Sequence, residues 1–196
     1  MRTNEKDLQA IHPLTRDAWR KWLIENHQKA DHIWFIRYKK SAGKPVVSFD
    51  EAVEEALCFG WIDSLPRKLD EERTMLYFAP RKKGSGWSRV NKQRIDRMLA
   101  EGKMMDAGLK KIEEAKADGS WSKLDAIENL EIPDDLAKAL ADRPPAADYF
   151  DAFPRSVKRG ILEWILNAKR SATREKRILQ TAEMAQKNER ANQWRK

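Results

Sequence analysis

The stretch SFDEAVEEALCFGWIDSL, residues 48–65, contains the start of a helix, its end and the strand that follows. Ser48 and Glu51 have the spacing of a capping box, in which each side chain bonds the backbone amide of the other residue. Apolar residues then recur at helical spacing, at Ala52, Val53, Ala56 and Leu57. Gly60 suits the left-handed position that ends a helix. Residues 61–65 are rich in strand-forming types, so this stretch predicts a helix that turns directly into a strand.

Two further strands are predicted on either side of this unit. Residues 33–38, IWFIRY, are aromatic and β-branched, and residues 74–79 have a similar character. The strands at 61–65 and 74–79 are close enough in sequence to form an antiparallel hairpin. After Pro80 the pattern is helical, with helices expected at about 89–100, 103–117, 123–130, 134–142, 146–152, 155–169 and 173–188. The sequence therefore predicts an α+β fold with a small antiparallel sheet of about three strands.

The prolines at 144 and 145 are the best break in the helical half of the chain. We expect residues 1–143 to form an α+β body of one helix, the sheet and further helices. Residues 144–196 are expected to form a basic helical C-terminal region packed on that body. At 196 residues the chain is long enough to bury a core without a disulfide or metal.

Positive charge is concentrated at the C-terminal end of the chain. The net charge is +8, and residues 155–196 hold 12 Lys and Arg against 4 Asp and Glu, so the rest of the chain is neutral. This distribution is typical of a protein that binds nucleic acid, an anionic membrane or an acidic protein. A solvated helical surface that is kept soluble by its charge explains the same distribution and is the favoured interpretation.

Several classes of protein are excluded by simple features. Cys58 is the only cysteine, so an internal disulfide cannot form, and the three histidines and this thiol lack the spacing of a zinc site. No run of about 20 apolar residues is present, so we expect no membrane insertion. The first residues, MRTNEKDLQA, lack the apolar core of an export signal, and we expect a cytoplasmic protein.

Residues 81–88, RKKGSGWS, form the first candidate site. Three cations precede two glycines and the expected start of a helix, whose exposed amides carry partial positive charge. The motif is not a phosphate-binding P-loop, and it can also be a basic loop in which Ser88 only caps the helix.

We expect this loop to bind an anionic small molecule against the strand at 61–65 and the residues just after it. Arginines would supply charge, serines and asparagine hydrogen bonds, and tryptophans an apolar wall. The expected ligand-binding residues are Trp61, Asp63, Arg67, Arg81, Ser85, Trp87, Ser88, Asn91 and Arg94.

Catalytic chemistry has weaker support. Glu55 and Asp63 can divide acid and base roles if the fold brings them together, but pairing of Asp63 with Arg67 or Arg81, and of Glu55 with another cation, is the favoured interpretation. Cys58 lies on an apolar helix and is expected to be buried and inert. We therefore assign no catalytic residue, no cofactor and no metal.

A second candidate site is the junction of the last two helices. Cations gather there at Lys169, Arg170, Arg174, Lys176 and Arg177. A helix pair with a basic turn can dock on a phosphate backbone, so nucleic-acid binding is the alternative function. A packed helical hairpin with a solvated basic rim explains the same pattern.

Two strings resemble a known family. Residues 54–64, EEALCFGWIDS, with Pro80, Arg81, Ser85, Trp87, Ser88, Asn91 and Arg94, resemble the bacterial YdeI/OmpD-associated proteins, and residues 168–178, AKRSATREKRI, resemble the helical end of that family. The resemblance implies a binding or stress-protection protein linked to resistance against bacteriocins and antimicrobial peptides. It brings no catalytic residue or cofactor. It also implies a porin partner and a periplasmic location, which the expected cytoplasmic location argues against.

Overall fold

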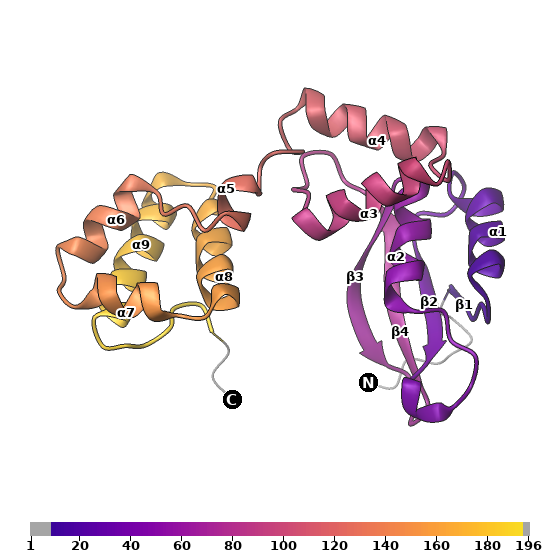
Figure 1. Ribbon diagram of the computed structural model, residues 1–196, viewed down its shortest axis with the longest axis horizontal. Helices are drawn as coiled ribbons and strands as arrows, with labels where there is room; N and C mark the ends of the chain where they lie inside the picture. Colours follow the sequence, from indigo (N-terminus) through magenta and orange to yellow (C-terminus); the bar gives the residue numbers. More distant parts are fainter. Residues whose placement is uncertain (1–8, 194–196) are drawn as a thin grey trace. The chain divides into compact units, whose positions relative to one another are not determined.

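The computed structural model describes residues 9–193 of the 196-residue chain (Figure 1). Its contacts divide the chain into two compact units between Ser122 and Lys123. The first unit combines a sheet with helices and the second is helical, which confirms the predicted α+β class with a helical C-terminal region. The division lies before the expected break at 143, because helices on both sides of the two prolines share one apolar core.

The N-terminal unit contains the sheet. Its elements are β1 (Ala10–Ile11), α1 (Arg16–Asn26), β2 (Ile33–Tyr38), the short 3-10 helix η2 (Lys40–Ala42), α2 (Phe49–Cys58), β3 (Trp61–Lys68), β4 (Arg73–Pro80), α3 (Arg89–Ala100) and α4 (Asp106–Ala117).

The four strands lie in the order β1-β2-β4-β3. The pairs β2–β4 and β3–β4 are antiparallel, as the sequence predicts for its three strands. The sequence misses β1, which pairs in parallel with β2, because two residues are too few to show an alternating pattern. The predicted sheet is therefore correct except for this short edge strand.

A β-bulge in β3 changes which face its later side chains occupy. Asp63 pairs with Phe78 and Pro66 pairs with Leu76, so three steps along β3 match two along β4. Phe78 and Leu76 both belong to the core beneath the helices. Arg67, opposite Met75, therefore lies on the other face, although simple alternation would place it on the face of Asp63.

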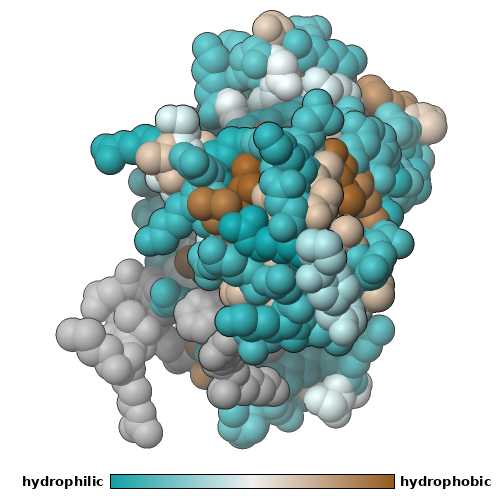
Figure 2. Space-filling view, turned by 90° about the vertical axis from the view of Figure 1, so that its left-hand side faces the viewer, coloured by the Kyte–Doolittle hydropathy of each residue, from teal (hydrophilic) through white to brown (hydrophobic). Residues whose placement is uncertain are grey.

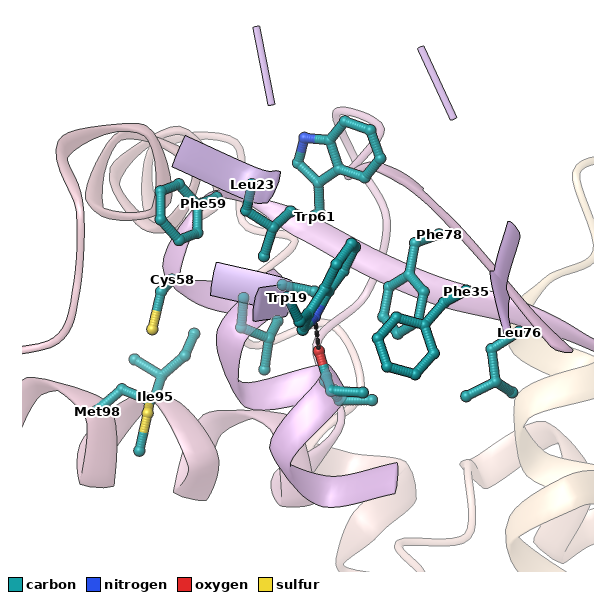
Figure 3. Packing of buried hydrophobic residues seen from close by; sticks show 14 of the residues in the cluster. Trp19, Leu23, Phe35, Cys58, Phe59, Trp61, Leu76, Phe78, Ile95 and Met98 are labelled. Carbon is teal, nitrogen blue, oxygen red and sulfur yellow. Dashed lines mark hydrogen bonds between the residues drawn. The ribbon is translucent and has the colours of Figure 1, made fainter. Parts of the chain in front are cut away.

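Helix α2 is the centre of the core. Its capping box between Ser48 and Glu51 forms as predicted, and Gly60 follows the helix with φ of 75°. The indole of Trp19, on α1, donates a hydrogen bond of 3.0 Å to the carbonyl oxygen of Ala52 on α2, drawn as a dashed line in Figure 3. Large apolar side chains from the sheet, α1, α2 and α3 surround this contact, among them Leu23, Phe35, Trp61, Phe78, Ile95 and Met98.

A network of buried charges joins α2 to α1 and α3. The side chain of Glu55 is 1% exposed. Its carboxylate accepts hydrogen bonds from Arg16 Nε and Arg20 Nη1, at 2.6 Å each. Glu54 accepts from Arg16 and from Arg97 of α3, at 3.1 and 2.8 Å. Each carboxylate thus has two guanidinium partners, which offsets the cost of removing it from water.

The C-terminal unit is formed by α5 (Asp125–Glu128), α6 (Asp134–Ala141), α7 (Ala146–Ala152), α8 (Arg155–Leu166) and α9 (Ser171–Ala185). Each helix was predicted, although α5 is shorter and α9 starts and ends earlier than expected. Its core includes Leu136, Phe150, Ile161 and Ala182, each fully buried. Among residues 9–193 no helix is long and apolar enough to cross a membrane.

The start of α4 packs directly on the end of α2. The amide of Met105 donates to the carbonyl oxygen of Cys58 at 3.1 Å, and a Cβ at Gly108 would lie 2.3 Å from that same oxygen. Gly108 is therefore required for the approach of the two helices. By contrast, a Cβ at Gly160 of α8 would meet nothing within 4 Å.

Gly108→Ala should destabilise the protein by about 2 kcal/mol or more, because the backbone must shift to admit the methyl group. Gly160→Ala, the matched control within another helix, should stabilise by about 0.5–1 kcal/mol. Urea unfolding followed by circular dichroism measures both. Alkylation of Cys58, which is fully buried, should speed up only in Gly108→Ala. Both substitutions replace glycine by alanine within a helix, so both gain helix propensity. If Gly108→Ala also stabilised the protein, the close contact would be contradicted.

Glu55→Gln should cost about 2–4 kcal/mol, because Arg20 loses its carboxylate and Arg16 keeps only Glu54. Glu113→Gln, at an exposed position of α4, serves as control and should change the free energy of unfolding by less than about 0.5 kcal/mol. A loss below about 1 kcal/mol for Glu55→Gln would show that the network does not hold the helices.

Candidate anion-binding site

Arg81 lies at the base of the loop 82–88, which joins β4 to α3. Its amide donates to the carbonyl oxygen of Gly60 at 2.9 Å, which ties the loop to the turn between α2 and β3. Its Nη2 donates to the carbonyl oxygen of Gly86 at 2.9 Å, and its Cζ lies 3.6 Å from the ring centroid of Trp87. The guanidinium is thus held over an indole of its own loop.

The charge of Arg81 is buried without an ion pair. The residue is 6% exposed, no carboxylate of residues 9–193 forms a salt bridge with it, and its Nε has no hydrogen-bond partner among them. Burial lowers the pKa of the guanidinium to about 10, and the attraction of Asp63 opposes this shift only in part. The group is still charged at neutral pH, in a setting where charge is costly.

A small hollow adjoins this guanidinium and is called here the Arg81 hollow. Residues of the loop and of α4 and the segment after it line the hollow: Arg81, Lys82, Lys83, Gly84, Ser85, Trp87, Lys111, Glu114, Ala115, Asp118 and Ser120. Its volume of about 10 Å³ is close to the space of one water molecule. Lys82 and Lys83 also line the hollow and are exposed. Their long side chains can contact an anion that is too large to enter the hollow.

Two acidic side chains balance part of this positive charge. Glu114 accepts from Lys111 Nζ at 2.8 Å. Asp118 accepts from the amide of Ser120 at 2.9 Å, and hydrogen bonds from Ser120 and from the amide of Gly84 lower the pKa of its carboxyl group. Neither carboxylate forms an ion pair with Arg81.

Arg94 forms a second buried group beside the first turn of α3. It is 8% exposed, its Nη1 donates to Asn91 Oδ1 at 2.7 Å, and its Nη2 pairs with Asp50 at the start of α2. Ser88 accepts from the amide of Asn91 at 3.4 Å and caps α3. Arg94 therefore has a carboxylate partner, although its Nε has none among the described residues.

Asp63 interacts electrostatically with both of these arginines. Burial raises the pKa of its carboxyl group, while Arg94 and Arg81 act in the opposite direction. It forms no ion pair within residues 9–193, so the pairing with Arg67 or Arg81 that the sequence favours is not present. The carboxyl group is the one negative charge among the described residues that acts on the pKa of Arg81, without a direct ion pair.

The structure brings together some of the expected residues and separates others. Ser85, whose Oγ donates to the carbonyl oxygen of Lys82 at 2.7 Å, lines the hollow with Arg81 and Trp87. Arg67 lies on the opposite face of the sheet, with its Cζ 4.9 Å from the ring centroid of Trp34. Trp61 is 1% exposed in the core and donates to the carbonyl oxygen of His27.

Lys111 and Ser120 line the hollow but were missed by sequence reasoning. They lie about thirty to forty residues after Arg81 in the sequence. No motif links them to the loop, because only the packing of α4 on the end of α2 brings them near.

The two carboxylates considered for catalysis have separate surroundings. Glu55 is held by Arg16 and Arg20, as the favoured structural interpretation predicts, and Asp63 faces Arg94 and Arg81. Cys58 is fully buried, and burial raises the pKa of its thiol to about 11, so the thiolate needed for attack is scarce at neutral pH. The ion pairs of Glu55 and the burial of Cys58 are the arrangements that the sequence favours for these two residues.

The basic C-terminal residues are partly engaged within their own unit. Arg174 donates two hydrogen bonds to the carboxylate of Asp135 on α6, at 2.7 and 2.9 Å. Arg177 donates a hydrogen bond to the carbonyl oxygen of Trp164. Lys169, Arg170 and Lys176 are exposed. Hydrophilic residues cover most of the face shown in Figure 2, with hydrophobic residues in small separate patches. Among residues 9–193, Arg174 is the one of these five cations whose charge is balanced by a carboxylate.

Comparisons with known proteins divide the chain in a similar way to its fold. No curated protein and no solved structure matches it. Residues 129–188 match the family described as bacteriocin-protection, YdeI or OmpD-associated. Residues 11–111 match a different model, the domain of unknown function DUF8412, so the string at 54–64 lies outside the YdeI match. Because this second match spans just over half of the chain, the protein belongs to the DUF8412 family, with a YdeI or OmpD-associated region within its C-terminal unit.

Proposed function

We propose that the protein is a non-enzymatic binding protein that captures a small phosphate- or carboxylate-bearing molecule at the Arg81 hollow. The observation that carries the proposal is the charged guanidinium of Arg81, which is buried without a carboxylate partner among residues 9–193. Such a charge costs stability unless an anion approaches it. An oxyanion at the mouth of the hollow would accept from Arg81 and meet the exposed Lys82 and Lys83.

The competing explanation is that Arg81 is a clamp for its own loop. Its bond to Gly86 and its contact with Trp87 would then be sufficient reason for its burial. The two explanations differ in what happens when the charge is removed but the chain length is kept. A clamp loses stability, whereas a binding residue loses ligand affinity and relieves an unfavourable burial.

A protective role is the biological setting that we propose for this capture. Support comes from the description of the family matched by residues 129–188, which names bacteriocin protection. Ligand capture would reside in the N-terminal unit, where the unpaired arginine lies. In the C-terminal unit, Arg159 and Arg174 form ion pairs with carboxylates of the same unit.

Pyrophosphate should raise the melting temperature of the wild-type protein by a few degrees when it is present well above its Kd. The shift should vanish in Arg81→Met and persist in Arg67→Met. Arg67 is a matched control because it also stacks on a tryptophan, but on the other face of the sheet. Sodium chloride at equal ionic strength corrects for general screening. A shift that is the same in all three proteins would refute binding at this hollow.

Without ligand, Arg81→Met should leave the free energy of unfolding unchanged or raise it by up to about 2 kcal/mol, because an unpaired buried charge is replaced by an apolar side chain. Urea unfolding of both proteins provides the comparison. A loss of more than about 2 kcal/mol would support the clamp, since the bond to Gly86 and the contact with Trp87 would then dominate.

A further inference from the structure

Trp121 presents an aromatic surface next to the Arg81 hollow. It directly follows Ser120, which lines the hollow, and its ring centroid lies 5.1 Å from that of Trp87. Its amide donates to the carbonyl oxygen of Ala115 at 3.0 Å, which fixes the residue against the end of α4. The side chain is partly exposed, whereas Trp87 is 2% exposed. One indole is therefore buried beneath Arg81 and the next one reaches the surface.

Two lysines lie over the ring of Trp121, which is partly exposed. Lys92 Nζ, from α3, lies 5.2 Å from the ring centroid of Trp121, and Lys116 Nζ, from α4, lies 5.5 Å from it. Arg81 and Trp87, which are both buried, form a neighbouring cation–aromatic pair. Cations at these distances are attracted by the ring face and stay near it.

The sequence around this surface is strongly biased toward positive charge. Residues 74–95 contain six Lys and Arg and no Asp or Glu. The acidic residues beside the hollow, Glu114 and Asp118, come from α4 and the segment after it. An aromatic platform within a cationic surface is the arrangement that binds a base and its phosphate together.

We infer that the anion captured here is a nucleoside phosphate, whose phosphate meets Arg81, Lys82 and Lys83 while its base stacks on Trp121. This inference rests on the proposed function, because it assigns a chemical class to the ligand of the same hollow. Lys92 and Lys116 border the base and add charge near further phosphates. A free nucleotide and a nucleotide within a single strand offer the same chemistry.

The experiment compares inorganic phosphate, AMP and a short adenine oligonucleotide by isothermal titration calorimetry. AMP should bind the wild-type protein about tenfold more tightly than phosphate or better, the order expected from one base–aromatic stack. Trp121→Leu should reduce the affinity for AMP to that for phosphate and leave phosphate binding unchanged. Arg81→Met should weaken both. Trp164→Leu is the matched control, since Trp164 is also partly exposed beside an arginine, and should change neither.

Phosphate binding with no preference for AMP, or a preference that survives Trp121→Leu, would overturn the inference and leave the proposed function standing. AMP binding that depends on Trp121 but not on Arg81 would overturn the proposed function instead. Binding of neither probe would remove both. If Trp121→Leu fails to fold, Trp121→Phe and Lys116→Gln replace it, and each should give a partial loss for AMP alone. Tighter binding of the oligonucleotide per nucleotide would identify a single strand as the source.

Discussion

The turn at Gly60 is the constraint on which the N-terminal unit depends. Its positive φ of 75° lets α2 end and β3 begin within two residues. A side chain here would also collide with α4, because a Cβ would lie 2.9 Å from the carbonyl oxygen of Ala107. The carbonyl oxygen of Gly60 also accepts a hydrogen bond from the amide of Arg81. One backbone position thus sets the direction of β3, the approach of α4 and the starting point of the loop that carries the candidate site.

The charges buried around α2 and near the hollow differ in kind. Glu54 and Glu55 each have two guanidinium partners, so these charges join three helices. Arg81 has an indole and a carbonyl oxygen but no carboxylate among the described residues. Paired buried charges hold helices together, whereas an unpaired buried charge carries a cost that an approaching anion would offset. This contrast is the reason for placing the site at Arg81 rather than at the more numerous ion pairs.

Local features of the fold could be read from the sequence, and long-range ones could not. The capping box at Ser48, the stop at Gly60 and the strands at 33–38 and 74–79 depend on neighbouring residues, and each was predicted. The bulge after Asp63 has no sequence signal, because it arises from pairing with β4, and it moves Arg67 away from the site. The loop at 81–88 was found from its own composition. Its second wall, with Lys111 and Ser120, depends on α4 packing and was missed.

The two compact units have a consequence for the ancestry of the chain. The division between Ser122 and Lys123 falls in the gap between the two family matches, which cover residues 11–111 and 129–188. Each unit has its own apolar core, so a joint at this point severs neither. Gene fusion or exchange there would bring together two modules, each with its own apolar core intact.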